Sequence, residues 1–128
     1  MKLSYRDAQR LLVGLRKIDE ADETKLDGEV RLKIGININR LQPHIKVFER
    51  EVQRIQRELH NGKGPDPSKM TEAEEELQRL SDTEDDYKLK KIDTGDLKLS
   101  SNTKIKADTL AQIAPVLRKF DDTLSDED

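Results

Sequence analysis

The sequence predicts a mainly α-helical fold: an antiparallel helical hairpin with one long kinked helix, a short third helix, a small β-hairpin and a C-terminal helix. Two observations carry this prediction. Apolar residues recur every three or four positions over residues 30–59, which is the spacing of one face of an α-helix. Only 33% of the 128 residues are hydrophobic and 3% are aromatic, which leaves a thin, aliphatic core. A long helical hairpin with a narrow apolar seam, or oligomerisation, can stabilise such a chain.

The first helix is expected over residues 5–20. Ser4 is a suitable N-cap residue, and the acidic side chain of Asp7 suits the positive end of a helix dipole. Gly14 costs this helix up to about 1 kcal/mol relative to alanine unless another element packs closely against it. The acidic residues 19–27 then form a turn. The stripe that this helix would bury consists of Ala8, Leu11, Leu12, Leu15 and Ile18.

The second helix has the strongest periodicity in the chain. It ends at the stop signal Asn61-Gly62. Pro43 removes one backbone hydrogen bond and clashes with the carbonyl of Asn39. Because the apolar spacing continues through Pro43, we expect a kink and not a break. Leu32 and Ile36 add a second apolar face near the start of the helix, so this end is expected to be buried on more than one side. The near-heptad seam itself consists of Val30, Ile34, Ile38, Leu41, Ile45, Phe48, Val52, Ile55 and Leu59.

The third helix is predicted to be short and highly charged. Residues 62–70 have the composition of a loop, and Thr71 with Glu74 forms a capping box that opens the helix. This helix has only Leu77 and Leu80 to bury, which is too little to cover the second half of the long helix.

The segment after the third helix is predicted to change from helix to strand. Residues 81–86 are expected to be the fraying end of the helix. Apolar residues alternate with lysines or other polar residues over 87–92 and 97–99, which predicts a small hairpin around a turn at residues 93–96.

The last helix is expected to be capped by Asp108 or Thr109. Pro115 lies inside it, which predicts a bend or a late start. Residues 1–120 are expected to form one helical domain, and residues 121–128 an acidic disordered tail. The apolar residues of this helix are Leu110, Ile113, Ala114, Leu117 and Phe120.

The order of these features resembles a family of small phage and prophage proteins of unknown function. The matching pieces are the sequence Met-Lys-Leu-Ser at residues 1–4, residues 30–48, the lysine-rich segment 87–93 and residues 106–117. The Gly- and Pro-rich residues 62–67 depart from the pattern of the family. The resemblance implies a viral origin and a small accessory role, and it carries no catalytic or binding residues onto this chain.

No arrangement of side chains predicts an enzyme. The chain has no cysteine, which excludes disulfides and thiolate metal sites. His44 and His60 are about 24 Å apart along one helix and cannot share a metal ion within one chain. The acidic residues 72–76 and 82–86 form a solvated face and lack the spacing of a calcium loop. We therefore expect no catalytic residues, no metal site and no cofactor.

A non-enzymatic protein–protein interaction module is the function that the sequence favours. The long seam exceeds what the shorter helices can cover, so part of it is expected to meet a second copy, as a homodimer, or a host or viral protein. In a phage, the chain would be a virion assembly factor or an inhibitor that binds a host enzyme or defence complex in the cytoplasm. The predicted partner-binding residues are Val52, Ile55, Leu59, Arg50, Arg54 and Arg57.

A small nucleic-acid-binding regulator is the alternative function. It would use the basic face of the long helix together with lysines that follow the third helix. The net charge of −3 argues against it, because nucleic-acid-binding domains usually carry a net basic face. No apolar run is long enough for a membrane helix, so no membrane partner is expected. The lysines in question are Lys88, Lys90, Lys91, Lys98, Lys104 and Lys106.

The acidic tail is predicted to be dispensable for folding. Residues 121–128 carry a charge of −5 and contain one apolar residue, Leu124, so burial cannot offset the entropy lost on ordering them. A chain that ends at Phe120 should keep its helical circular dichroism and its melting temperature. A clear loss of either would mean that the tail docks on the folded body.

Overall fold

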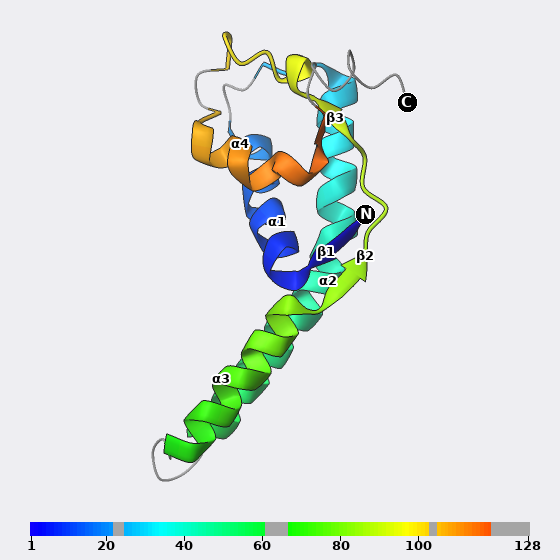
Figure 1. Cartoon of the computed structure of the whole chain (residues 1–128). Coiled ribbons are helices and arrows are strands. Elements are labelled where there is room, and N and C mark those ends of the chain that lie inside the picture. The colour runs from blue at the N-terminus through cyan, green and yellow to red at the C-terminus, as the bar shows by residue number, and fades with distance from the viewer. Residues whose placement is uncertain (22–24, 61–66, 103–104, 119–128) are drawn as a thin grey trace.

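The computed structural model describes residues 1–21, 25–60, 67–102 and 105–118, and within these ranges the chain is mainly helical. Four α-helices are present: α1 (Tyr5–Asp19), α2 (Gly28–His60), α3 (Pro67–Asp82) and α4 (Ala107–Ile113). Figure 1 shows two parts, a head formed by α1, α4 and the first half of α2, and a projecting arm formed by α3 and the second half of α2. The predicted fold class is confirmed.

Helix α1 forms as its sequence predicts. The Ser4 side chain accepts a hydrogen bond from the Asp7 backbone N–H at 3.1 Å and so caps the first turn. The predicted stripe is buried, and Gly14 is buried with it. A Cβ atom at Gly14 would lie 2.8 Å from Gln112 Cβ and from Ile113 Cγ2 of α4. The glycine is therefore needed because α4 crosses α1 at this point.

Helix α2 continues through Pro43 without interruption. Its ribbon changes direction about halfway along, which agrees with the predicted kink (Figure 1). The first half of its seam packs in the head against α1, and Leu41 is fully buried there. The core of the head is a single cluster whose largest fully buried members include Leu11, Leu15, Ile18, Ile34, Leu41, Ile92, Leu97 and Ile113.

Helix α3 is longer than predicted. It begins at Pro67, so Thr71 lies inside the helix and does not cap it. Proline is well suited to the first turn of a helix, because its missing N–H has no intrahelical partner there. The extra turn lets α3 run beside the second half of α2 (Figure 1). The predicted loop over residues 62–70 is thus wrong at its end, and residues 61–66 lie outside the described residues.

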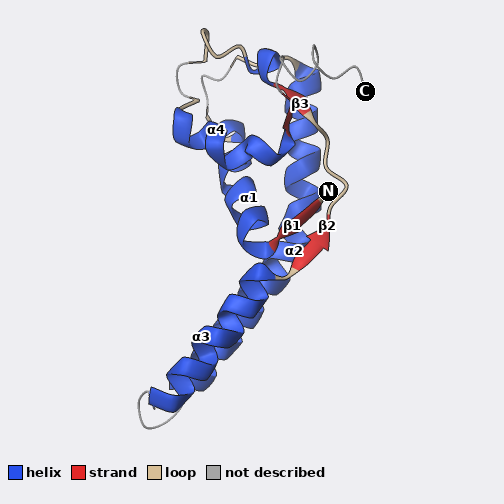
Figure 2. Ribbon diagram, viewed as in Figure 1, coloured by secondary structure: helices blue, strands red, loops and turns tan. Residues whose placement is uncertain are grey.

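The β-structure is formed by partners that the local sequence does not reveal. Strand β1 (Lys2–Ser4) pairs antiparallel with β2 (Glu84–Asp86), with Leu3 opposite Asp85. A two-residue strand β3 (Ile92–Asp93) pairs parallel with β4 (Leu117–Arg118), and Figure 2 shows the two sites at separate places on the head. The small antiparallel element is therefore present, but the predicted hairpin between residues 87–92 and 97–99 is not. Residues 94–97 form a 3₁₀ turn, η1, instead.

Two buried asparagines hold the irregular segments on the head. Asn37 of α2 donates to the Lys90 carbonyl at 3.0 Å and accepts from the Lys90 N–H at 2.7 Å. Asn102 accepts a hydrogen bond from the Lys25 N–H and donates to the carbonyls of Lys25 and Leu97. Each amide satisfies backbone groups that would otherwise lack partners in a buried place. The segment around residue 90 is therefore fixed beside α2 without forming a strand.

Helix α4 starts earlier and ends earlier than predicted. It begins at Ala107, so neither Asp108 nor Thr109 is the cap, and Thr109 is buried. It ends at Ile113, two residues before Pro115, and a 3₁₀ turn, η2 (Ala114–Val116), follows it. Pro115 has no N–H to donate to the Ala111 carbonyl four residues back, so the α-helical hydrogen bonding stops there, although Ala114 keeps a helical backbone conformation. The predicted bend is thus a termination, and Phe120 and the tail 121–128 lie outside the described residues.

The close crossing of α1 and α4 can be tested by substituting Gly14. In an isolated helix, alanine is favoured over glycine by about 1 kcal/mol. Here the added methyl group would overlap two atoms of α4, and such overpacking costs roughly 1–3 kcal/mol. We expect Gly14→Ala to lower the free energy of unfolding in urea titrations. An unchanged or higher stability would mean that α4 does not cross α1 so closely.

Candidate protein-interaction surface

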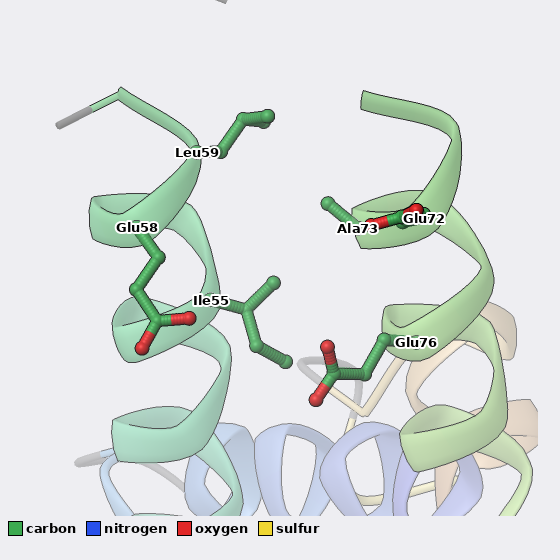
Figure 3. A pocket seen from close by; sticks show the side chains of 6 residues that line it. All are labelled: Ile55, Glu58, Leu59, Glu72, Ala73 and Glu76. Carbon is green, nitrogen blue, oxygen red and sulfur yellow. The ribbon is translucent and has the colours of Figure 1, made fainter. Parts of the chain in front are cut away.

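The predicted apolar site residues lie in the arm, between α2 and α3. Ile55 is only 3% exposed and faces Ala73 of α3, so a partner cannot reach it while α3 is in place. Val52 and Leu59 are half-buried. Figure 3 shows Ile55 and Leu59 projecting from α2 toward α3. The expectation that this part of the seam lacks an intrachain cover is therefore wrong for Ile55 and holds in part for Val52 and Leu59.

A shallow hollow remains at the open end of the arm. It has a volume of about 240 Å³. Three carboxylates, from Glu58, Glu72 and Glu76, lie around it together with Ile55, Leu59 and Ala73 (Figure 3). Within the described part of the chain, no group of three or more histidine or acidic side chains is arranged to hold a metal ion. We assign this hollow to imperfect packing between two charged helices.

The three predicted arginines have different surroundings. Arg54 donates to Glu58 of α2 at 2.7 Å, is bonded to Glu51, and lies 3.6 Å from Glu76 of α3. The hydrogen bond from Arg54 lowers the pKa of the Glu51 carboxyl. Arg54 therefore joins α2 to α3, whereas Arg50 and Arg57 are exposed and, among the residues that the structure describes, have no ion pair.

The most exposed large apolar side chains of the described residues lie on the opposite face of α2. Leu32 is 63% exposed and Val47 is 59% exposed. With half-buried Ile36 and exposed Pro43 they repeat at steps of four, seven and four residues, so all four lie on one face of the helix. This face points away from the seam that packs on α1. We call it the outer face of α2 and define it by Glu29, Leu32, Ile36, Asn39, Pro43, Val47 and Arg50.

The C-terminal half of the outer face is basic and has no acidic lining. A shallow hollow of about 560 Å³ lies over it. Lys46 and Arg50 both line this hollow, and neither forms an ion pair with any other residue in the described ranges. The hollow is lined by Asn39, Gln42, Pro43, Lys46, Val47 and Arg50. An apolar stripe with unpaired charges at its rim is the usual arrangement of a protein-binding surface.

A cluster of titratable and aromatic side chains fastens β2 to α2. His44 Nδ1 lies 3.0 Å from the Asp85 carboxylate, and the Tyr5 hydroxyl donates to the same carboxylate at 3.5 Å. The rings of Tyr5 and Phe48 stack with centroids 5.2 Å apart. Burial, and to a smaller extent the charge of Asp85, raises the pKa of Tyr5. This cluster holds the β1–β2 pair against the long helix.

The Tyr87 hydroxyl is the one buried side-chain polar atom in the described residues that has no hydrogen-bond partner. Burial raises its pKa first, followed by the nearby charges of Tyr5 and Asp85, so the hydroxyl stays protonated. The His44 ring packs edge-on against Tyr87 with centroids 5.1 Å apart. The edge-on contact with His44 therefore adds the Tyr87 ring to the packing of this cluster.

Comparisons with known proteins give no relative. No protein-family model matches the sequence, and no characterised protein or solved structure is significantly similar to it. Among the described residues, no helix has both the length and the apolar character needed to cross a membrane.

The outer face was only partly visible in the sequence. Leu32 and Ile36 form a second apolar face by their spacing, but the expectation that this end is buried on more than one side is wrong, because Leu32 is 63% exposed and Ile36 is only half-buried. Val47 and Pro43 continue that face at helical spacing, and this continuation was the available signal. It was hidden because the seam on the other side of the same helix contains more apolar residues.

Matched substitutions on the two faces of α2 can separate seam from surface. Ile55→Asp would bury an unpaired charge against α3, and we expect it to cost roughly 3 kcal/mol of unfolding free energy. Val47→Asp lies on the exposed face and should change stability by less than about 0.5 kcal/mol. Thermal melts of both variants and the wild type decide this. Equal losses would contradict the assignment of the two faces.

Proposed function

We propose that this chain is a non-enzymatic protein–protein interaction module that binds its partner through the outer face of α2. The observation that carries the proposal is the exposure of Leu32 and Val47 on one continuous helix face. Isolated exposed apolar side chains are ordinary on monomers, but several apolar residues on one helix face with charges at its rim are uncommon outside interfaces. The unpaired side chains of Lys46 and Arg50 add charges that a partner can complement.

A role in a phage is the biological setting that we propose. The resemblance to small phage and prophage proteins supports it. Within that setting, a virion assembly factor and an inhibitor of a host enzyme or defence complex both need what this chain offers: a small folded body with one long, accessible helix. The arm adds a second surface that a partner can reach, because Val52 and Leu59 are only half-buried there.

Nucleic-acid binding is supported less well by the arrangement of the basic residues. Arg54 is surrounded by three carboxylates, and Lys98 Nζ pairs with Asp27 at 2.9 Å. Lys91 donates to the Pro115 carbonyl. These contacts leave fewer cations free to neutralise phosphates than the sequence implied. Lys104 lies outside the described residues.

Charge placed on the outer face tests the proposal. The variant Leu32→Glu/Val47→Glu should keep the circular dichroism and the melting temperature of the wild type, because both side chains are exposed. Immobilised wild-type protein should retain the free chain itself or a protein from a bacterial host lysate. The double variant should retain at least tenfold less of the same species.

Val13→Glu is the matched control, because Val13 is 42% exposed but lies on α1. It should retain the same species as the wild type. Retention that is equal in the wild type and the double variant, or retention of nothing at all by the wild type, would contradict the proposal. Retention of nucleic acid that disappears with added salt would favour the regulator instead.

A further inference from the structure

We infer that the outer face of α2 binds a second copy of this chain, with the two α2 helices antiparallel. The inference rests on the proposed function and names the partner for the same surface. It follows from the order of side chains along the outer face, which is self-complementary when one copy is reversed.

A two-fold axis between residues 39 and 40 defines the register. Leu32 then lies opposite the partner's Val47, and Ile36 lies opposite the partner's Pro43. Each of these pairs is equally distant from the axis on its two sides, so the apolar residues of one copy cover those of the other. By symmetry every such contact forms twice. The two most exposed apolar side chains of α2 thus cover one another.

The same register pairs opposite charges at the ends of the contact. Glu29 lies opposite the partner's Arg50. The Glu29 side chain is 80% exposed, and the contact it makes within its own chain is a long one, 3.8 Å to Lys33 Nζ. Arg50 has no ion pair among the described residues. A parallel arrangement would place Arg50 against Arg50 and Glu29 against Glu29, so like charges exclude it.

The centre of the contact is compatible with the axis. Asn39 is exposed and lies beside the axis, next to the partner's Asn39. A carboxamide both donates and accepts hydrogen bonds, so two copies of it can pair with each other. Arg40 lies close to the axis as well, but its guanidinium bonds to the Lys88 carbonyl of its own chain. The parts of the arms beyond Arg50 then project from opposite ends of the pair.

The size of the contact sets the expected strength. The paired region, residues 28–50, follows about 33 Å of helix at 1.5 Å per residue, is one helix wide and includes the bend of α2. Such a strip buries less than the roughly 1,200 Å² of the smallest standard interfaces, which places the pair in the weak class. The dimer should therefore form in a concentration-dependent way at micromolar concentrations or above.

Cysteine cross-linking tests the register directly, because the chain has no cysteine of its own. An equimolar mixture of Leu32→Cys and Val47→Cys should form a disulfide-linked dimer under mild oxidation. Neither variant should do so alone, because identical positions are about 22 Å apart in this register and a disulfide needs Cα atoms within about 7 Å. We expect at least tenfold more covalent dimer in the mixture. Val13→Cys mixed with Val47→Cys is the control for random collision.

A dimer formed by Leu32→Cys alone would show a parallel pair and overturn the inference. Cross-linking in the mixture no greater than in the Val13→Cys control would do the same. The wild type could instead be monomeric by sedimentation and retain a host protein that the outer-face variant does not retain. That result would overturn the inference that the partner is a second copy, and the proposed function would stand. If cross-linking shows no specific dimer and the wild type also retains no protein through its outer face, the proposed function is overturned as well.

A charge swap provides an independent measurement of the same register. Glu29→Arg and Arg50→Glu should each weaken the dimer roughly fivefold in sedimentation equilibrium, because each replaces two symmetric attractions with repulsions. The double variant Glu29→Arg/Arg50→Glu should restore the affinity of the wild type. Failure of the double variant to recover affinity, with the fold intact by circular dichroism, would contradict this pairing.

Discussion

The difference in length between α1 and α2 is the constraint on which the rest of the structure depends. Helix α2 has 33 residues and α1 has 15, and the apolar seam runs along nearly all of α2. One helix cannot cover that seam, and uncovered apolar surface is costly in water. The chain therefore covers it in two sections, with α1 in the head and α3 in the arm. The head and the arm follow from that division.

The two sections differ in how well they are packed. The head has a contiguous core in which Leu41 and Ile92 are fully buried, and polar asparagines fix the segments that cross it. The arm has a narrow seam in which Ile55 and Ala73 are buried, and ion pairs of Arg54 supplement it. Local opening requires little free energy where few apolar contacts are lost. The arm is therefore the part of the molecule that should open first.

The outer face of α2 is the side of that helix that no other described element covers. In α2 the seam faces α1 and α3, and the segment around Lys90 lies along one flank through Asn37. The outer face is what remains, and Leu32 and Val47 lie on it. A chain with few apolar residues has little reason to expose two large ones on the same helix face unless a partner covers them.

Local sequence determined the elements that depend on neighbouring residues. Periodicity alone located α2 and its seam, and the Ser4 cap located the start of α1, because helical spacing and capping act within a few residues. The tertiary structure decided what depends on distant residues. Strand Glu84–Asp86 has an acidic sequence with no strand pattern, and it forms because residues 2–4 supply a pairing edge. The same holds for the interaction surface: Ile55 could be recognised as apolar from the sequence, but only the position of α3 determined that it is buried while Val47 is left exposed.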